Sequence, residues 1–262
     1  MNVKQVQQAL LTLGFDPNGV DGVWGRGAKL ACMAFQRSAG LSADGVPGPA
    51  TQEALKQRLA GGAVETPAPN PMPLVMQRAE KLGYKVWGDK FRLWLFGIRS
   101  PNRQAGMFDD TLGVCWTEGD GFWRCEYWPG TTDPGVVWLE NPGKEAGTAI
   151  LKEGQYIDCW QIGLHRGEYE ALKQCSPVEV YRDANRDDNL DLDPNNVHQG
   201  LYGINIHAAT RKAGGRSTQV HRWSAGCQVH ATEAGFSRMM ELVHMQANAG
   251  IEKFSYTLLD AW

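Results

Sequence analysis

The sequence predicts a multidomain α+β protein, in which a small three-helix domain precedes a larger and mainly β domain. Apolar residues recur at helical spacing in the first sixty positions. A segment rich in proline and glycine follows, and most of the remaining chain consists of short strand-like runs between turn residues. We therefore divide the chain into residues 1–60, a linker over 61–73, and a second domain over 74–262.

The first domain carries three predicted helices. Val3, Val6, Leu10 and Leu13 repeat at intervals of three and four, which predicts a helix over 3–14 that ends at Gly14. Two further helices are expected over 26–38 and 49–59. The pattern Asp-Gly-Val-x-Gly occurs at 21–25 and again at 44–48, before the second and third helices. This short internal repeat indicates that two similar loops connect the helices.

The segment 61–73 predicts a semi-extended linker, because it holds four prolines and two glycines with little apolar content. Beyond it, helices are expected over 74–82 and 233–248. The predicted strands are residues 92–98, 112–117, 122–127, 136–139, 148–151, 156–162, 178–181, 203–207 and 253–258.

Composition narrows the classes of function. The formal net charge is −3 and the sequence pI is about 6.1, which argues against a nucleic-acid partner. No apolar run is long enough for membrane insertion, and the first residues lack the pattern of a signal peptide, so we expect synthesis in a cytoplasm. We also expect a monomer. The six cysteines form no Cys-x-x-Cys pair, which disfavours a zinc ribbon, and most are expected to be buried apolar residues.

One cysteine has the surroundings of a nucleophile. Cys227 ends the string Ser224-Ala225-Gly226-Cys227 and follows His207, at the end of a predicted strand, by twenty residues. Imidazole is well suited to take the proton of a thiol near neutral pH, and a small residue followed by glycine allows a sharp turn whose N–H groups face an oxyanion. A second imidazole, His221, lies six residues before the cysteine.

The first domain resembles the peptidoglycan-binding domain found at the ends of many cell-wall hydrolases. The similar segments are Val6–Leu10, Leu13–Phe15, Val20–Gly25, Ala34–Gln36, Gly40–Leu41 and Asp44–Gly48. The resemblance implies bacterial peptidoglycan as a partner.

The second domain resembles the L,D-transpeptidase catalytic domain. The similar features are the turn at 131–135, the strand ending in His207 and the Ser-x-Gly-Cys motif at 224–227. Ala225 departs from the pattern, because the family carries histidine there. The strings Val180–Asp183, Gly203–Ala208 and Ser224–Val229 are also similar to those in a group of phage lysis proteins.

These resemblances imply a phage endolysin that cleaves peptidoglycan stem peptides or cross-links through a thioester. His207 is then the general base for Cys227, and His221 either orients the site or holds the base in its productive tautomer. Backbone N–H groups of Gly226 and Cys227 stabilise the oxyanion, and Ser224 supports the turn. Such a protein is expected to stay in the host cytoplasm until it is released to the wall.

Three other functions stay open at this point. Transfer to an amine in place of water gives an L,D-transpeptidase. A glycan-strand hydrolase needs two carboxylates across a cleft. Glu118, Asp120 and Glu140 could supply them, but their spacing in the sequence does not favour any pair. An inactive wall-binding protein is favoured by Ala208 and Ala225.

An acidic segment suggests an optional calcium site, although no cofactor is required by the expected chemistry. Oxygen-bearing side chains alternate along the segment as they do in a calcium loop of the EF-hand kind. They belong to Asp183, Asn185, Asp187, Asn189 and Asp191. Asp188 and Pro194 stand where that loop has glycine and a bidentate glutamate, so a solvated acidic turn is the alternative.

Overall fold

A computed structural model describes residues 1–17, 19–59 and 71–262. It consists of two compact units, Met1–Pro69 and Asn70–Trp262, and the division between them falls inside the predicted linker. Residues 61–70 of that linker lie outside the described residues. Each unit is described separately below.

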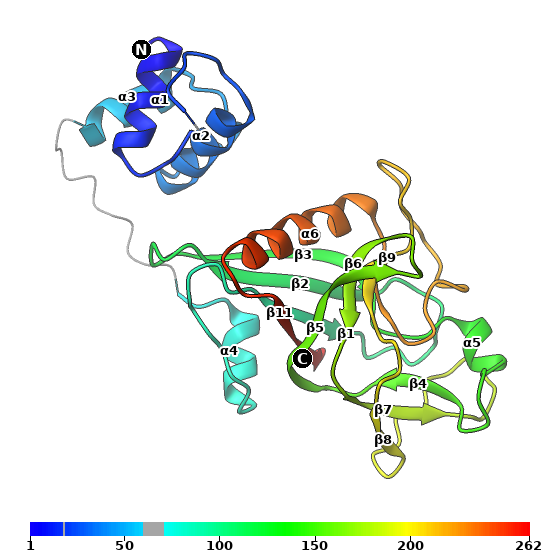
Figure 1. The fold of residues 1–262 in the computed structure, drawn as a ribbon. Coiled ribbons are helices and arrows are strands. Elements are labelled where there is room, and N and C mark those ends of the chain that lie inside the picture. Colours follow the sequence, from blue (N-terminus) through cyan, green and yellow to red (C-terminus); the bar gives the residue numbers. More distant parts are fainter. Residues whose placement is uncertain (18, 60–70) are drawn as a thin grey trace. The chain divides into compact units, whose positions relative to one another are not determined.

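The first unit contains the three predicted helices (Figure 1): α1 (Val3–Thr12), α2 (Arg26–Ser38) and α3 (Pro49–Leu59). The side chain of Asn2 accepts a hydrogen bond from the Gln5 N–H, and the Gln5 side chain accepts one from the Asn2 N–H, so α1 begins with a capping box. The apolar faces of the helices meet in a small core of Val6, Ala9, Leu10, Ala31, Cys32, Phe35 and Leu55.

Two buried glutamines hold the repeated loops. Gln7 donates to Asp21 Oδ1 and to the Val23 carbonyl, and it accepts from the Gly22 N–H. Gln36 repeats all three bonds one loop later, on Asp44, Val46 and Gly45. Each glutamine thus satisfies the polar groups of a tight loop from inside the helix bundle, which explains why the Asp-Gly-Val pattern occurs twice.

The second unit is built around a closed sheet of eight strands in the order β1-β11-β5-β6-β9-β10-β3-β2. The pairs β1/β11 and β9/β10 are parallel and the other pairs are antiparallel. The strands are β1 (Trp94–Arg99), β2 (Asp110–Thr117), β3 (Trp123–Thr131), β5 (Gly154–His165), β6 (Tyr169–Gln174), β9 (Ile206–Ala208), β10 (Gln228–His230) and β11 (Lys253–Asp260).

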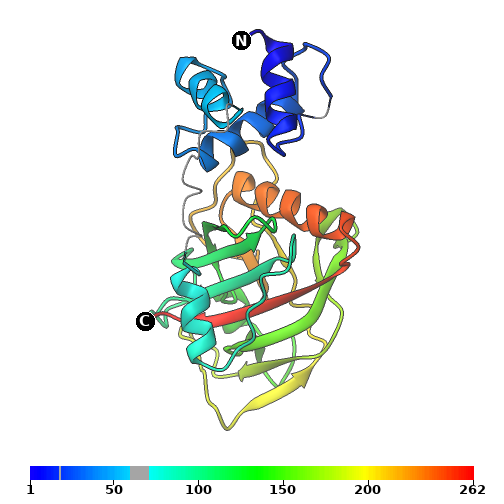
Figure 2. The same cartoon turned by 90° about the vertical axis from the view of Figure 1, so that its left-hand side faces the viewer.

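A smaller antiparallel sheet has the order β4-β7-β8, with β4 (Thr148–Leu151), β7 (Val178–Asp183) and β8 (Val197–Gly200). Three helices complete the unit: α4 (Leu74–Lys81), α5 (Val136–Glu140) and α6 (Glu233–Asn248). Helix α6 lies across the closed sheet (Figures 1 and 2), and its apolar residues Phe236, Met239 and Val243 share the main core with Trp160 and Tyr256.

The structure confirms the predicted α+β fold class and corrects four details. Residues 136–139, expected as a strand, belong to helix α5, in which Leu139 is fully buried. Strands β6 and β8 were not predicted, because their sequences alternate weakly and carry several polar residues. Strand β10 was also not predicted, because it is only three residues long.

Two of the six cysteines are joined. Cys115 and Cys125 are paired in register across β2 and β3 and form a disulfide bond, which the sequence analysis did not foresee. The free cysteines are Cys32, Cys159, Cys175 and Cys227, of which the first two are buried. No helix among the described residues combines the length and apolar character needed to cross a bilayer.

Candidate active site

Cys227 lies immediately before β10, beside the chain that leads into β9. Its sulfur accepts a hydrogen bond from the Asn205 N–H at 3.4 Å, and the thiol reaches the Gly203 carbonyl at 3.5 Å. In the parallel pair β9/β10, Val229 is the partner of His207. Because side chains alternate along a strand, Cys227 shares the sheet face of Val229 and therefore of His207.

The turn before Cys227 depends on two residues of the predicted motif. Gly226 has a φ of 112°, and a Cβ atom there would lie 2.2 Å from the Ala149 carbonyl oxygen, so only glycine fits. Ser224 is fully buried, and its hydroxyl accepts from the Gly226 N–H and donates to the Cys227 carbonyl. Ser224 thus ties the turn together on its inner side.

These bonds bear on the expected oxyanion donors. The Gly226 N–H, which the sequence assigned to the oxyanion, is occupied by Ser224 Oγ at 3.1 Å. The Cys227 N–H has no hydrogen-bond partner among the described residues. Of the two backbone donors expected from the sequence, the one at Cys227 is therefore available in this structure.

The His207 side chain is 2% exposed, and only one of its two ring nitrogens has a hydrogen-bond partner among the described residues. Its Nδ1 lies 3.0 Å from the Ala208 carbonyl oxygen, which can only accept, so Nδ1 carries the proton in the neutral ring. The lone pair then lies on Nε2, which is buried and has no hydrogen-bond partner among the described residues. That is the tautomer in which Nε2 can accept a proton.

Two residues that the sequence analysis did not single out lie against this imidazole. His165 stacks on His207 with ring centroids 4.1 Å apart, and its Nδ1 is 3.1 Å from the side-chain amide of Asn205. The Tyr169 hydroxyl donates to the Ala208 carbonyl at 3.2 Å and lies 3.5 Å from His207 Nδ1. His165 and Tyr169 are paired across the β5–β6 hairpin.

Burial keeps both central groups neutral at physiological pH. It lowers the pKa of His207 to about 3, with smaller contributions from the charges of His165 and Arg166. Burial also raises the pKa of Cys227 to about 11, against the Asn205 N–H and the charge of Arg166, which both lower it. The resting pair is therefore a thiol and an imidazole. No hydrogen bond joins the sulfur to either ring nitrogen of His207 within the described part of the chain.

His221 occupies a different position. It lies on the loop between β9 and β10, its side chain is exposed, and its backbone carbonyl packs against Gly135. The side chain makes no hydrogen bond or ion pair with any described residue. Among the described residues, no hydrogen bond, ion pair or ring contact links His221 to Cys227 or His207.

The turn at residues 131–135 has a structural partner. Thr132 and Asp133 bind the guanidinium group of Arg99, which is fully buried and also contacts Glu153. Burial raises the pKa of Asp133 to about 7, while Arg99 lowers it. The Gly135 N–H donates to the Ser224 carbonyl, so this segment supports the turn that carries Cys227.

Hydrogen bonds within the acidic segment 183–191 hold its carboxylates. Asp183 Oδ2 accepts from the Asp191 N–H, and Asp187 accepts from the backbone of Asn189 and from the side chain of Asn185. Asp183 is fully buried and its Oδ1 lacks a partner among the described residues. Across those residues, no three side chains of His, Cys, Asp or Glu are grouped so as to hold a metal ion. A calcium site here stays a prediction.

A cavity of about 510 Å³ opens beside His207. Its lining includes His165, Arg166, Glu168, Tyr169, His207, Arg211, Arg216 and Trp223. Cys227 is not among the lining residues, and its sulfur is hydrogen-bonded to the Asn205 N–H and the Gly203 carbonyl. A second cavity adjoins this one along α6. Glu118 and Asp120 pair with Arg124 near the β2–β3 turn and line neither of the two cavities.

Comparison with known proteins found one family match, which falls in the first unit. Residues 1–55 match the family described as "Putative peptidoglycan binding domain". No curated protein is similar to the chain at a significant level.

Two solved structures are similar to the chain at low identity. The first is the L,D-transpeptidase (residues 123–326) of Xylanimonas cellulosilytica, at 18% identity over 98% of this chain and 93% of that one, with a TM-score of 0.30. The second is a fused Zn-dependent amidase/peptidase/peptidoglycan-binding domain-containing protein of Clostridium acetobutylicum, at 15% identity over 98% and 94%, with a TM-score of 0.25. TM-scores of this size do not establish a common fold.

Proposed function

We propose that the chain is a peptidoglycan-cleaving cysteine enzyme. Its first unit binds the wall, and its second unit cleaves stem peptides with Cys227 as nucleophile and His207 as general base. The observation that carries the proposal is the unprotonated Nε2 of a buried histidine, which has no hydrogen-bond partner among the described residues and lies on the strand next to a cysteine held by a backbone N–H. The family match of residues 1–55 supports peptidoglycan as the ligand.

The chemistry follows from the neutral resting pair. As the sulfur attacks a peptide carbonyl carbon, Nε2 of His207 takes the thiol proton, and the Cys227 N–H donates to the oxyanion. Collapse of the tetrahedral adduct breaks the C–N bond, and the imidazolium returns the proton to the leaving amine. Water then attacks the thioester, which releases a carboxylate product and restores the thiol.

The biological setting forms part of the same proposal. The similarity of Val180–Asp183, Gly203–Ala208 and Ser224–Val229 to strings in phage lysis proteins supports a lysis role. In that role the endolysin is made in the host cytoplasm, reaches the wall after release, and uses water as the acceptor.

Digestion of purified peptidoglycan tests the proposal. We expect Cys227→Ala to lower the release of soluble fragments by at least about a thousandfold, because the thioester cannot form. Cys175→Ala is the matched control, since Cys175 is also a free, partly exposed cysteine but lies at the end of β6, away from His207. Mass spectrometry of the products should show new amine and carboxylate ends in the peptides.

The other outcomes identify the alternatives. Full clearing by Cys227→Ala together with new reducing sugar ends would replace the proposal by a glycan hydrolase. Exchange of terminal residues without net cleavage would indicate a transpeptidase. Binding without any product from the unaltered chain would leave a wall-binding protein.

A further inference from the structure

The cavity beside His207 is strongly cationic at its rim. Three arginines line it, Arg166, Arg211 and Arg216, against the single carboxylate of Glu168. Burial lowers the pKa of the two lining histidines, so neither adds charge at neutral pH, and neither offsets the excess of guanidinium groups. A cavity of this charge is complementary to an anion.

Arg166 is the lining arginine whose charge affects the pKa values of both His207 and Cys227. It lies in the turn of the β5–β6 hairpin with a φ of 52°, next to His165, which stacks on His207. Its charge lowers the pKa of His165, Tyr169, His207 and Cys227 alike. Its side chain is exposed and forms no ion pair with any described residue, so its charge is available to a ligand.

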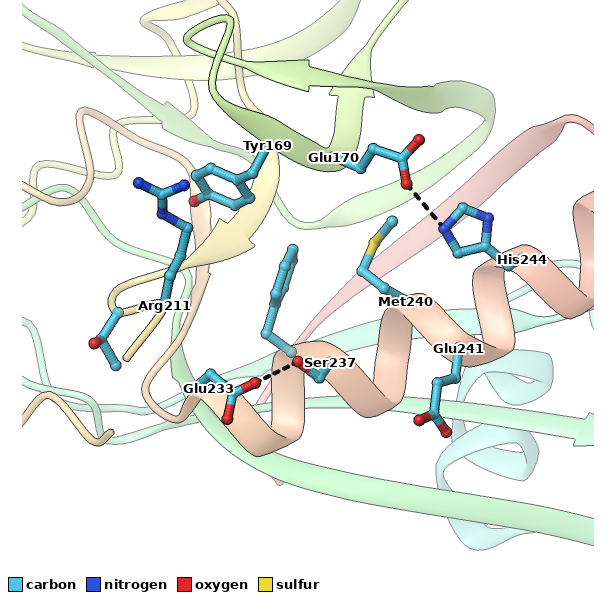
Figure 3. Close-up of a pocket in the computed structure, with 10 residues that line it drawn as sticks. Tyr169, Glu170, Arg211, Glu233, Ser237, Met240, Glu241 and His244 are labelled. Atoms are coloured by element: carbon cyan, nitrogen blue, oxygen red, sulfur yellow. Dashed lines mark hydrogen bonds and ion pairs between the residues drawn. The ribbon is translucent and has the colours of Figure 1, made fainter. Parts of the chain in front are cut away.

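Arg211 faces the same space from the opposite loop. Its guanidinium group lies over the Tyr169 ring, 4.8 Å from the centroid (Figure 3), and this contact orients it toward the cavity that Tyr169 also lines. Its Nη2 contacts the Glu168 carboxylate at 3.1 Å, and both side chains are 56% exposed. A pair this exposed is weak, and it shows that a carboxylate can be accommodated on Arg211.

The neighbouring cavity has the opposite character. It shares Tyr169, Thr210 and Arg211 with the first cavity and continues along α6. Figure 3 shows its wall of carboxylates, with Glu170 paired to His244 and Glu233 bonded to Ser237. Of the two adjoining cavities, the one beside His207 therefore favours an anion, and the one along α6 does not.

We propose that Arg166 and Arg211 form a carboxylate subsite beside the candidate catalytic pair, which selects peptides that carry a free carboxylate next to the bond that is cut. This inference rests on the proposed function, because it names the substrate class of that same site. It predicts that amidation of the stem-peptide carboxyl groups weakens recognition. Bidentate guanidinium–carboxylate contacts supply both the affinity and the orientation of the peptide.

Binding to a chain that cannot react tests the subsite. The full-length Cys227→Ala chain is titrated calorimetrically with two probes, the tetrapeptide L-Ala-γ-D-Glu-L-Lys-D-Ala and the same peptide with both carboxyl groups as carboxamides. We expect the free-carboxylate peptide to bind at least about tenfold more tightly. Adding Arg166→Gln or Arg211→Gln should remove most of this preference, and 0.5 M salt should reduce it.

Lys212→Gln, in the same Cys227→Ala background, is the matched control, because Lys212 is an exposed cation next to Arg211 that does not line the cavity. It should leave the preference unchanged. Equal binding of both peptides, a preference that survives both arginine substitutions, or no binding of either peptide would overturn the subsite.

The experiments can refute the subsite and the proposed function independently of each other. If the peptide preference depends on Arg166 but the unaltered chain releases nothing from peptidoglycan, the subsite stands and the catalytic proposal falls. If the unaltered chain cleaves stem peptides while the preference is absent, the catalytic proposal stands and the subsite falls.

Discussion

At the scale of single residues, burial decides the state of the candidate nucleophile and base. A thiolate at the partly exposed Cys227 and an imidazolium at the buried His207 would each lose hydration, and no hydrogen bond between them is present among the described residues to compensate. The result is a pKa of about 11 for Cys227 and about 3 for His207. The cysteine is thus a neutral thiol at rest, the form that reacts slowly with electrophiles.

Alkylation of Cys227 should follow this neutral state. At pH 7 roughly one thiol in ten thousand is ionised when its pKa is about 11, so iodoacetamide should react slowly, and its rate should rise about tenfold per pH unit up to pH 10. The modified peptide that contains Cys227 is quantified by mass spectrometry. His207→Gln should leave the profile unchanged, because His207 does not share the thiol proton in the resting state. A rate that levels off below pH 8 would instead reveal a preformed thiolate–imidazolium pair.

The residues of the candidate site differ in how far the sequence predicts them. Cys227, His207, Ser224 and Gly226 belong to one turn and one strand end, so local patterns were enough to single them out. His165 and Arg166 belong to the β5–β6 hairpin, and β6 was missed because its sequence, Tyr-Glu-Ala-Leu-Lys-Gln, has no clear alternation. Their approach to His207 follows from strand pairing, which a single sequence does not specify.

At the scale of elements, periodicity predicted the long helices but failed for short apolar runs. The run Val-Val-Trp-Leu at 136–139 is compatible with either a strand or one helical turn. Gly135 at its start and the burial of Leu139 select the helix. The repeated loops of the first unit were visible because their glycines and aspartates recur, whereas the glutamines that hold them lie inside helices and gave no signal.

Gln36→Leu tests the role of these glutamines. The change removes the bonds from Nε2 to Asp44, Val46 and Thr51 and leaves the buried Gly45 N–H without its acceptor. We expect the free energy of unfolding of the first unit to fall by about 2–4 kcal/mol. Denaturant unfolding measures this loss. Gln57→Leu, at an exposed position of α3, should change the value by less than about 0.5 kcal/mol, and an equal effect of both changes would contradict the role.

At the scale of the whole molecule, the wall binding and the chemistry that we propose belong to units with separate cores. The core of the first unit contains only residues from α1, α2, α3 and the adjoining loops, whereas three further clusters stabilise the second unit. Separate cores allow each unit to unfold by its own cooperative transition. Damage to the wall-binding unit is then expected to leave the candidate catalytic pair in place.

Scanning calorimetry of the full chain tests this independence. Residues 1–69 and 70–262 differ in length, so we expect two transitions with enthalpies of about 50 and about 135 kcal/mol near 60 °C. Gln36→Leu should lower only the smaller transition, by about 14–28 °C for a loss of about 2–4 kcal/mol in a unit of that size. Between the two transitions the variant should lose retention on peptidoglycan while its second unit stays folded. A single transition, or an equal shift of both, would show that the two units stabilise each other, and wall binding would then be coupled to the integrity of the site around Cys227.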